Sequence, residues 1–277
     1  MNRQLTPLRY IMVLTGIVAL TLGIGFAFNL PWATALWPWP DGPLSFLFVG
    51  SILAAISIAF IWIGFTAEWG ATAAGALTVL VMTAGQAAFL FLLAGQPNRQ
   101  GLLPFAVWFA LVALASVGAF VWSRRFPIRD IRPLPRLLQI SYLLFVAILL
   151  LSGAALTLGV QIFPWQLKPD SAVIFGWIFL GDACYFLYSF LNPRWHNARG
   201  QLLSFLVYDV FLIPRFLGMF GEPNRNLTAL VIYLLVLLYS GMLAVYYLFI
   251  DPRTRPWAIQ EQPTPQRAAS PPVGGGY

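Results

Sequence analysis

Eight runs of about 20 consecutive apolar residues fill most of this 277-residue chain. A helix rises about 1.5 Å per residue, so a run of about 20 residues is what the roughly 30 Å hydrocarbon core of a bilayer requires. Only 9% of the residues are charged, whereas about a quarter are charged in a typical soluble domain. We therefore predict an all-α polytopic protein of the cell membrane, with the lipid bilayer as its main partner. The predicted spanning helices are 9–30, 43–65, 71–95, 102–123, 137–160, 171–191, 201–220 and 227–250.

The inventory of metal and cofactor ligands is very small. His196 is the single histidine and Cys184 the single cysteine, so neither a bis-histidine haem nor an iron–sulfur cluster is supported. We predict no metal site and no cofactor. His196 falls in the polar segment 192–196, where we expect a solvated side chain. The net charge of +7 is carried between the apolar runs, which indicates membrane orientation and not nucleic-acid binding.

The basic residues gather on one side of the predicted membrane. Cytoplasmic loops carry the excess of Lys and Arg in membrane proteins. The asymmetry therefore places both termini in the cytoplasm and favours an even number of helices. One side holds Arg3, Arg9, Arg124, Arg125, Arg129, Arg132, Arg136, Arg194, Arg199, Arg253, Arg255 and Arg267, and the other holds Arg99, Lys168 and Arg225.

Short motifs recur in the same order in the two halves of the chain. The run GQPNRQ at 95–100 returns as GEPNRN at 221–226, and ALTLG at 19–23 returns at 155–159. We predict two four-helix repeats. An even number of helices in each repeat gives both the same orientation in the membrane. The predicted units are repeat 1–122, a basic linker 123–136, repeat 137–250 and a disordered cytoplasmic tail 251–277 rich in Pro and Gly.

Three charged residues fall inside the predicted spans. Asp182 and Asp209 each lie 11 residues from the outer end of their helix, about 16 Å deep, and Arg215 lies about 8 Å deep. Charge in hydrocarbon is costly, so such residues are functional candidates. Aligning the repeats pairs Asp182 with Ser51 and Asp209 with Thr83, so the site predicted from these charges belongs to the second repeat.

Three roles remain open for these residues. In a structural role, Arg215 pairs with a carboxylate in the membrane or reaches outward to Glu222. In a transport role, the two aspartates share a proton and couple its movement to a small solute. The sequence favours a non-enzymatic permease, or an accessory subunit that binds other membrane subunits or a second copy of itself.

The third role is enzymatic. Gly181-Asp182 and Tyr208-Asp209 resemble the Gly-Asp and Tyr-Asp pairs of intramembrane aspartyl proteases, in which two carboxylates share a proton and activate water. The order of the pairs is reversed here, and Phe179 stands where the first glycine of the family's Gly-x-Gly-Asp pattern is expected. An aspartate-dependent membrane enzyme is therefore the alternative to a permease.

Overall fold

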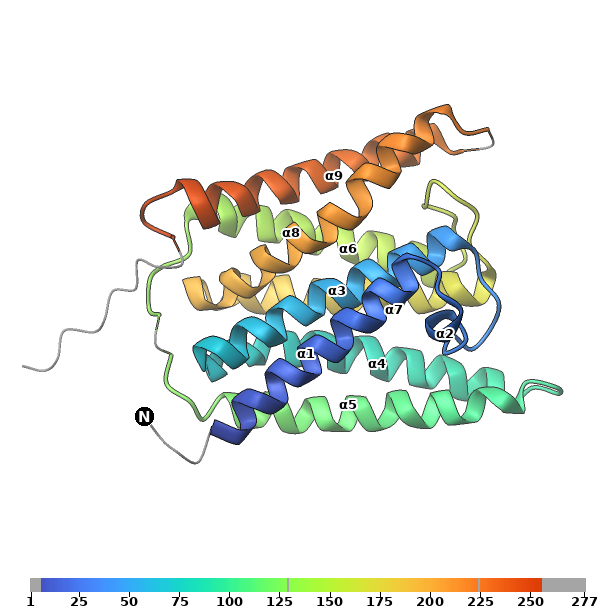
Figure 1. Ribbon diagram of the computed structural model, residues 1–277, viewed down its shortest axis with the longest axis horizontal. Helices are drawn as coiled ribbons and strands as arrows, with labels where there is room; N and C mark the ends of the chain where they lie inside the picture. The colour runs from blue at the N-terminus through green and yellow to red at the C-terminus, as the bar shows by residue number, and fades with distance from the viewer. Residues whose placement is uncertain (1–5, 129, 224, 256–277) are drawn as a thin grey trace, which may run out of the picture.

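The computed structural model describes residues 6–128, 130–223 and 225–255, and these residues form a bundle of long helices (Figure 1). Eight helical segments of the described chain are long and apolar enough to cross a membrane, which confirms the predicted number of spans. The helices are α1 (Thr6–Ala27), the short α2 (Pro31–Thr34), α3 (Pro43–Thr66), α4 (Thr72–Ala94), α5 (Leu103–Ser123), α6 (Arg136–Thr157), α7 (Pro169–Leu191), α8 (Trp195–Gly218) and α9 (Leu227–Val245). Single turns of 3₁₀ helix at Trp69–Ala71, Gln100–Leu102 and Met219–Gly221 and a π turn at Tyr246–Ile250 extend or join them.

Local chemistry explains several helix starts. Pro43 and Pro169 occupy the first turn of α3 and α7, where a proline's missing N–H costs no helical hydrogen bond. The side chain of Asn226 caps α9 by accepting a hydrogen bond from the Ala229 N–H at 3.0 Å. Pro214 lies inside α8 and leaves the carbonyl of Val210 without its helical donor.

The helices pair first within each half and then between the halves. Within the halves, α1 packs on α3, α4 on α5, α6 on α7, and α8 on α9. Between the halves, α4 packs on α7 and α3 on α8. Although α7 and α8 are consecutive, they do not pack along each other. They meet near the short connection between them, where the Tyr185 hydroxyl donates to the Asn197 carbonyl at 2.6 Å.

The two ends of the bundle differ in chemistry. We call one the basic end, because Arg9 donates to the Gly64 carbonyl there and Arg132 to the Arg253 carbonyl. We call the other the aromatic end. Its aromatic cluster contains Phe26, Trp37, Trp39, Phe46, Phe48, Phe163, Trp165, Phe175, Phe179 and Phe216. In Figure 1 the basic end lies on the left, on the side of the label N.

The predicted linker and tail are partly built into the bundle. Leu134 of the linker is buried, and its N–H donates to the Pro193 carbonyl at 3.0 Å. At the start of the predicted tail, Thr254 is buried and donates to the Tyr247 carbonyl at 2.6 Å. The rest of the predicted disordered tail, 256–277, lies outside the described residues.

Helix α1 touches α3 backbone to backbone through glycines. A Cβ added to Gly50 would lie 2.5 Å from the Gly23 carbonyl oxygen, and one added to Gly23 would lie 2.8 Å from the Gly50 carbonyl oxygen. In lipid, small residues at such crossings allow the van der Waals contact that holds helices together.

We expect Gly50→Ala to force α1 away from α3 and to lower the free energy of unfolding by about 1 to 3 kcal/mol, the usual range for overpacking. Unfolding by SDS in mixed micelles measures this. The control is Gly118→Ala in α5, where an added Cβ meets no atom within 4 Å. Because alanine favours helix over glycine, the control should be neutral or slightly stabilised. An equal effect of the two substitutions would contradict the close crossing.

Candidate functional site

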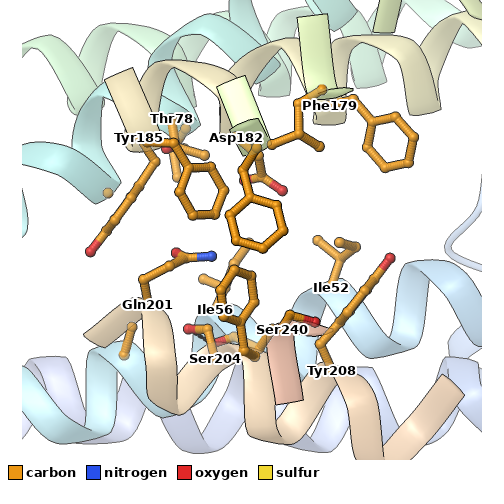
Figure 2. A pocket seen from close by; sticks show the side chains of 18 of the residues that line it. Ile52, Ile56, Thr78, Phe179, Asp182, Tyr185, Gln201, Ser204, Tyr208 and Ser240 are labelled. Atoms are coloured by element: carbon orange, nitrogen blue, oxygen red, sulfur yellow. Dashed lines mark hydrogen bonds between the residues drawn. The ribbon is translucent and has the colours of Figure 1, made fainter. Parts of the chain in front are cut away.

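A cavity of about 770 Å³ lies in the middle of the bundle. Each of the eight spanning segments contributes at least one residue to its wall. The wall is mostly aliphatic and aromatic, as in small-molecule sites, and its volume is within the range of such sites. Figure 2 shows the cavity between α7 on one side and α3 and α8 on the other.

Asp182 points into this cavity from α7 (Figure 2). It is the one carboxylate among the described lining residues, and no Lys, Arg or His of the described chain lines the cavity with it. Within the described residues, the Asp182 carboxylate has neither a hydrogen-bond partner nor an ion-pair partner. An unpaired carboxylate in an apolar wall is costly, and the cavity is therefore the prime candidate for a functional site.

Gln201 points into the same cavity from α8, on the wall opposite Asp182 (Figure 2). Its side-chain amide has no hydrogen-bond partner in the described part of the chain. Gln201, Ser204 and Tyr208 follow one another at helical spacings of three and four residues, which brings them to one face of α8. This polar stripe is the sequence signal for Gln201, which carries no charge and was therefore not among the predicted site residues.

Several hydroxyl groups of the wall are already used inside the protein. Tyr185 donates to Asn197, and Ser204 donates to the Ala55 carbonyl of α3 at 2.7 Å. The hydroxyls of Tyr208 and Tyr233 bond to each other. These contacts fix the wall and leave Asp182 and Gln201 with polar atoms to offer to a bound molecule.

Asp209 lies elsewhere, between α8 and α9. The Ser240 hydroxyl reaches both of its carboxylate oxygens at 3.2 Å, and a Cβ on Gly241 would lie 3.0 Å from one of them. No hydrogen bond joins Asp182 to Asp209, and Asp209 is absent from the cavity wall described above. The proton-sharing pair expected from equal depth needs direct contact, and the packing of α7 and α8 does not supply it.

Arg215 lies at the aromatic end of α8, where its side chain is 39% exposed. Its guanidinium donates to Glu222 at 2.5 Å, and Arg225 donates to the same carboxylate at 2.5 Å. The hydrogen bonds from Arg215 and Arg225 hold the pKa of Glu222 below its usual value. This is the outward partner that the sequence allows, and it places Arg215 away from the cavity.

A buried ionic cluster at the basic end was not predicted. It consists of Glu68, Asp130, Arg132 and Arg199, and the Asp130 carboxylate accepts from Arg132 at 2.6 Å and from Arg199 at 2.9 Å. Asp130 and Arg199 are 5% and 4% exposed. Arg199 also lies over the ring of Trp62, 5.7 Å from its centre, and Trp62 lines the cavity. The cluster therefore lies next to the basic end of the cavity.

The expectation that His196 is solvated was wrong. Helix α8 begins at Trp195 and not near 201, so His196 and Arg199 lie in its first turns and are 4% exposed. The linker covers this region, because the Trp195 N–H donates to the Arg132 carbonyl at 2.8 Å. The burial of His196 depends on contacts with linker residues far away in the chain. The local sequence around 195–200 therefore does not predict it.

We expect Asp130→Asn to lower the free energy of unfolding by about 3 to 5 kcal/mol, because it leaves Arg199 buried without its full countercharge. SDS-induced unfolding in mixed micelles measures the loss. Asp170→Asn is the matched control. Asp170 pairs with Arg99 at 2.8 Å on the surface, and an exposed pair contributes about 0 to 1 kcal/mol. Equal losses for the two variants would contradict the buried cluster.

The same aspartate gives a pH prediction. Burial raises the pKa of Asp130, but the hydrogen bond and charge of Arg132 and the charge of Arg199 outweigh it, so this pKa lies below the ordinary 3.8. A lowered folded pKa stabilises the protein above the ordinary value and ceases to do so as the pH falls through the lowered one. We expect the difference between wild type and Asp130→Asn to be full at pH 7 and to shrink below about pH 4. A difference that grows on acidification would contradict this sign.

Comparisons with known proteins do not add a relative. No protein-family model matches the chain, and neither a curated protein nor a solved structure is significantly similar to it. A function is therefore inferred from the cavity and the charged residues around it.

Proposed function

We propose that this chain is a permease that carries a small organic solute across the membrane through its central cavity, with Asp182 exchanging a proton during the cycle. The observation that carries the proposal is the unpartnered Asp182 carboxylate in a cavity of about 770 Å³ walled by all eight spans. Ionisable residues inside membrane proteins mark solute pathways and proton relays.

Competition for the Asp182 carboxylate can couple solute movement to proton movement. A bare carboxylate is strongly disfavoured in an apolar wall and is neutralised by a proton or by a cation. Occupation by one displaces the other. A transporter that opens to each side in turn can then link the movement of a solute to the movement of a proton.

The surroundings of the cavity support alternating access. Towards the aromatic end, Phe163 and Phe179 line the cavity and stack with their ring centres 5.9 Å apart. Towards the basic end, Trp62 lines it under the Arg199 guanidinium. Two separate groups of contacts, one aromatic and one ionic, thus border the solute space. Alternating access requires that each group opens while the other stays closed.

We also propose that the units 1–122 and 137–250 are copies in the same orientation. Helices α1 and α6 both begin at the basic end (Figure 1). The proposed repeat matches α3 with α7 and α4 with α8. It therefore matches the α4–α7 contact with the α8–α3 contact. Each of these contacts carries one hydrogen bond across the halves, from Gln86 to the Ile174 carbonyl and from Ser204 to the Ala55 carbonyl. This reciprocity supports a pseudo-twofold axis along the membrane normal.

For the orientation, we propose that the basic end faces the cytoplasm, in keeping with the bias of Arg towards this end. A fluorescent reporter that matures only in the cytoplasm, fused to Tyr277, should therefore be bright. A second fusion after Gly101, in the connection between α4 and α5 at the aromatic end, should be dark although the protein is inserted. A bright second fusion with a dark first one would reverse the proposed orientation.

Transport is tested in liposomes that contain the purified protein and a pH-sensitive dye. We expect at least one member of a panel of small organic cations, neutral solutes and anions to cross with a change of internal pH. Asp182→Asn should reduce this coupled movement to the level of protein-free liposomes, because an amide holds neither the proton nor a countercharge.

The control for this experiment is Asp209→Asn, which removes the aspartate buried between α8 and α9 without changing a residue of the cavity wall. It should keep the coupled movement. Movement by Asp182→Asn equal to that of wild type, or no movement above the protein-free level by wild type with the whole panel, would contradict the permease proposal.

A further inference from the structure

We infer that the central cavity binds an organic cation that joins a protonated amine to an apolar body, with the ammonium between Asp182 and Gln201. This inference rests on the proposed function in that it names the solute class for the same cavity. It stands on the charge, the polar groups and the wall of that cavity.

The charge of the wall selects a cation. Asp182 is the one carboxylate of the described lining, and no described Lys, Arg or His there offsets it. An anionic solute would bring a second negative charge beside Asp182 in a poorly screened space, and the two like charges would repel each other. A protonated amine instead supplies the missing countercharge and forms a charge-assisted hydrogen bond to the carboxylate.

The opposite wall completes the ammonium site. The Gln201 amide points into the cavity across from Asp182 and has no partner in the described chain (Figure 2). Its carbonyl oxygen can accept a second N–H bond of the ammonium. A carboxylate and an amide carbonyl from opposite helices therefore offer two hydrogen-bond acceptors to a bound cation.

The rest of the wall selects an organic cation over a metal ion. Calcium and magnesium ions take six or more oxygen ligands. No group of three or more acidic, His or Cys side chains that could hold a metal exists among the described residues. The wall carries aromatic rings, among them Phe145, Phe179, Phe186 and Phe205. Such rings bury an apolar body and attract a cation to their faces.

Three probes of one shape test this inference. They are 4-phenylbutylamine, which is cationic at pH 7, the neutral 4-phenylbutanol and the anionic 4-phenylbutyrate. Binding to the purified full-length protein in mild detergent is followed by calorimetry and by tryptophan fluorescence, since Trp62 lines the cavity. We expect the amine to bind at least about tenfold more tightly than the alcohol, equivalent to about 1.4 kcal/mol, and the butyrate to bind most weakly.

The variants locate the selectivity. Asp182→Asn should bring the amine and the alcohol to the same affinity, whereas Asp209→Asn should keep the wild-type ratio. Gln201→Leu should weaken the amine by about three- to tenfold and leave the alcohol less affected. Asp182→Glu retains the carboxylate and should keep the preference for the amine, which makes the test decisive even where Asp182→Asn unfolds.

Other results overturn the inference. Equal binding of amine and alcohol by wild type would do so, as would a preference for the amine that survives Asp182→Asn. Amine binding without uptake into liposomes would uphold this site and contradict the permease. Uptake of neutral solutes without amine binding would leave the permease in place and reject the amine site.

Discussion

The close approach of α4 and α7 is the contact on which the arrangement of the two halves depends. Lipid tails are as apolar as leucine, so helices in a membrane associate by close contact and not by expulsion of water. Gly85 of α4 leaves room for the Trp177 ring, and Gly181 of α7 lets that helix approach the Thr78 carbonyl of α4. A hydrogen bond from Gln86 to the Ile174 carbonyl lies beside them. Glycine on both helices therefore sets the distance between the halves, and with it one wall of the cavity.

In the proposed repeat, each aspartate of the second half corresponds to a hydroxyl residue of the first half. Ser51 is the proposed counterpart of Asp182, and its hydroxyl donates to the Phe48 carbonyl of its own helix. Thr83, the proposed counterpart of Asp209, donates in the same way to the Val79 carbonyl. A hydroxyl can return its hydrogen bond to the helix that carries it, whereas an ionised carboxylate has no donor to return. An ionised carboxylate therefore needs a donor from another element, as Asp209 of α8 has in Ser240 of α9.

Length and hydropathy were enough to predict the eight spans, because the thickness of the bilayer fixes how long an apolar helix must be. The rarity of charge in lipid likewise singled out Asp182. Hydrogen-bond and ion-pair partners from distant parts of the chain could not be predicted from length, hydropathy or charge alone. Asp130 meets Arg199 across 69 positions of the chain, and α8 begins earlier than its apolar run because the linker covers its first turns. Equal depth also suggested that Asp182 and Asp209 share a proton, whereas α7 packs on α6 and α4, and α8 packs on α3 and α9.

The crossed pairing of the halves has a consequence for biogenesis. Gln86 bonds to a residue 88 positions later in the chain, and Ala55 to one 149 positions later. At a synthesis rate of about 5 to 20 residues per second, α3 and α4 wait in the bilayer for about 4 to 30 s before their partners emerge. During that time the polar groups of these helices that later face the second half lie against lipid or other helices. The nascent chain thus passes through a stage in which these polar groups lack their final partners, and a membrane chaperone could cover them during that stage.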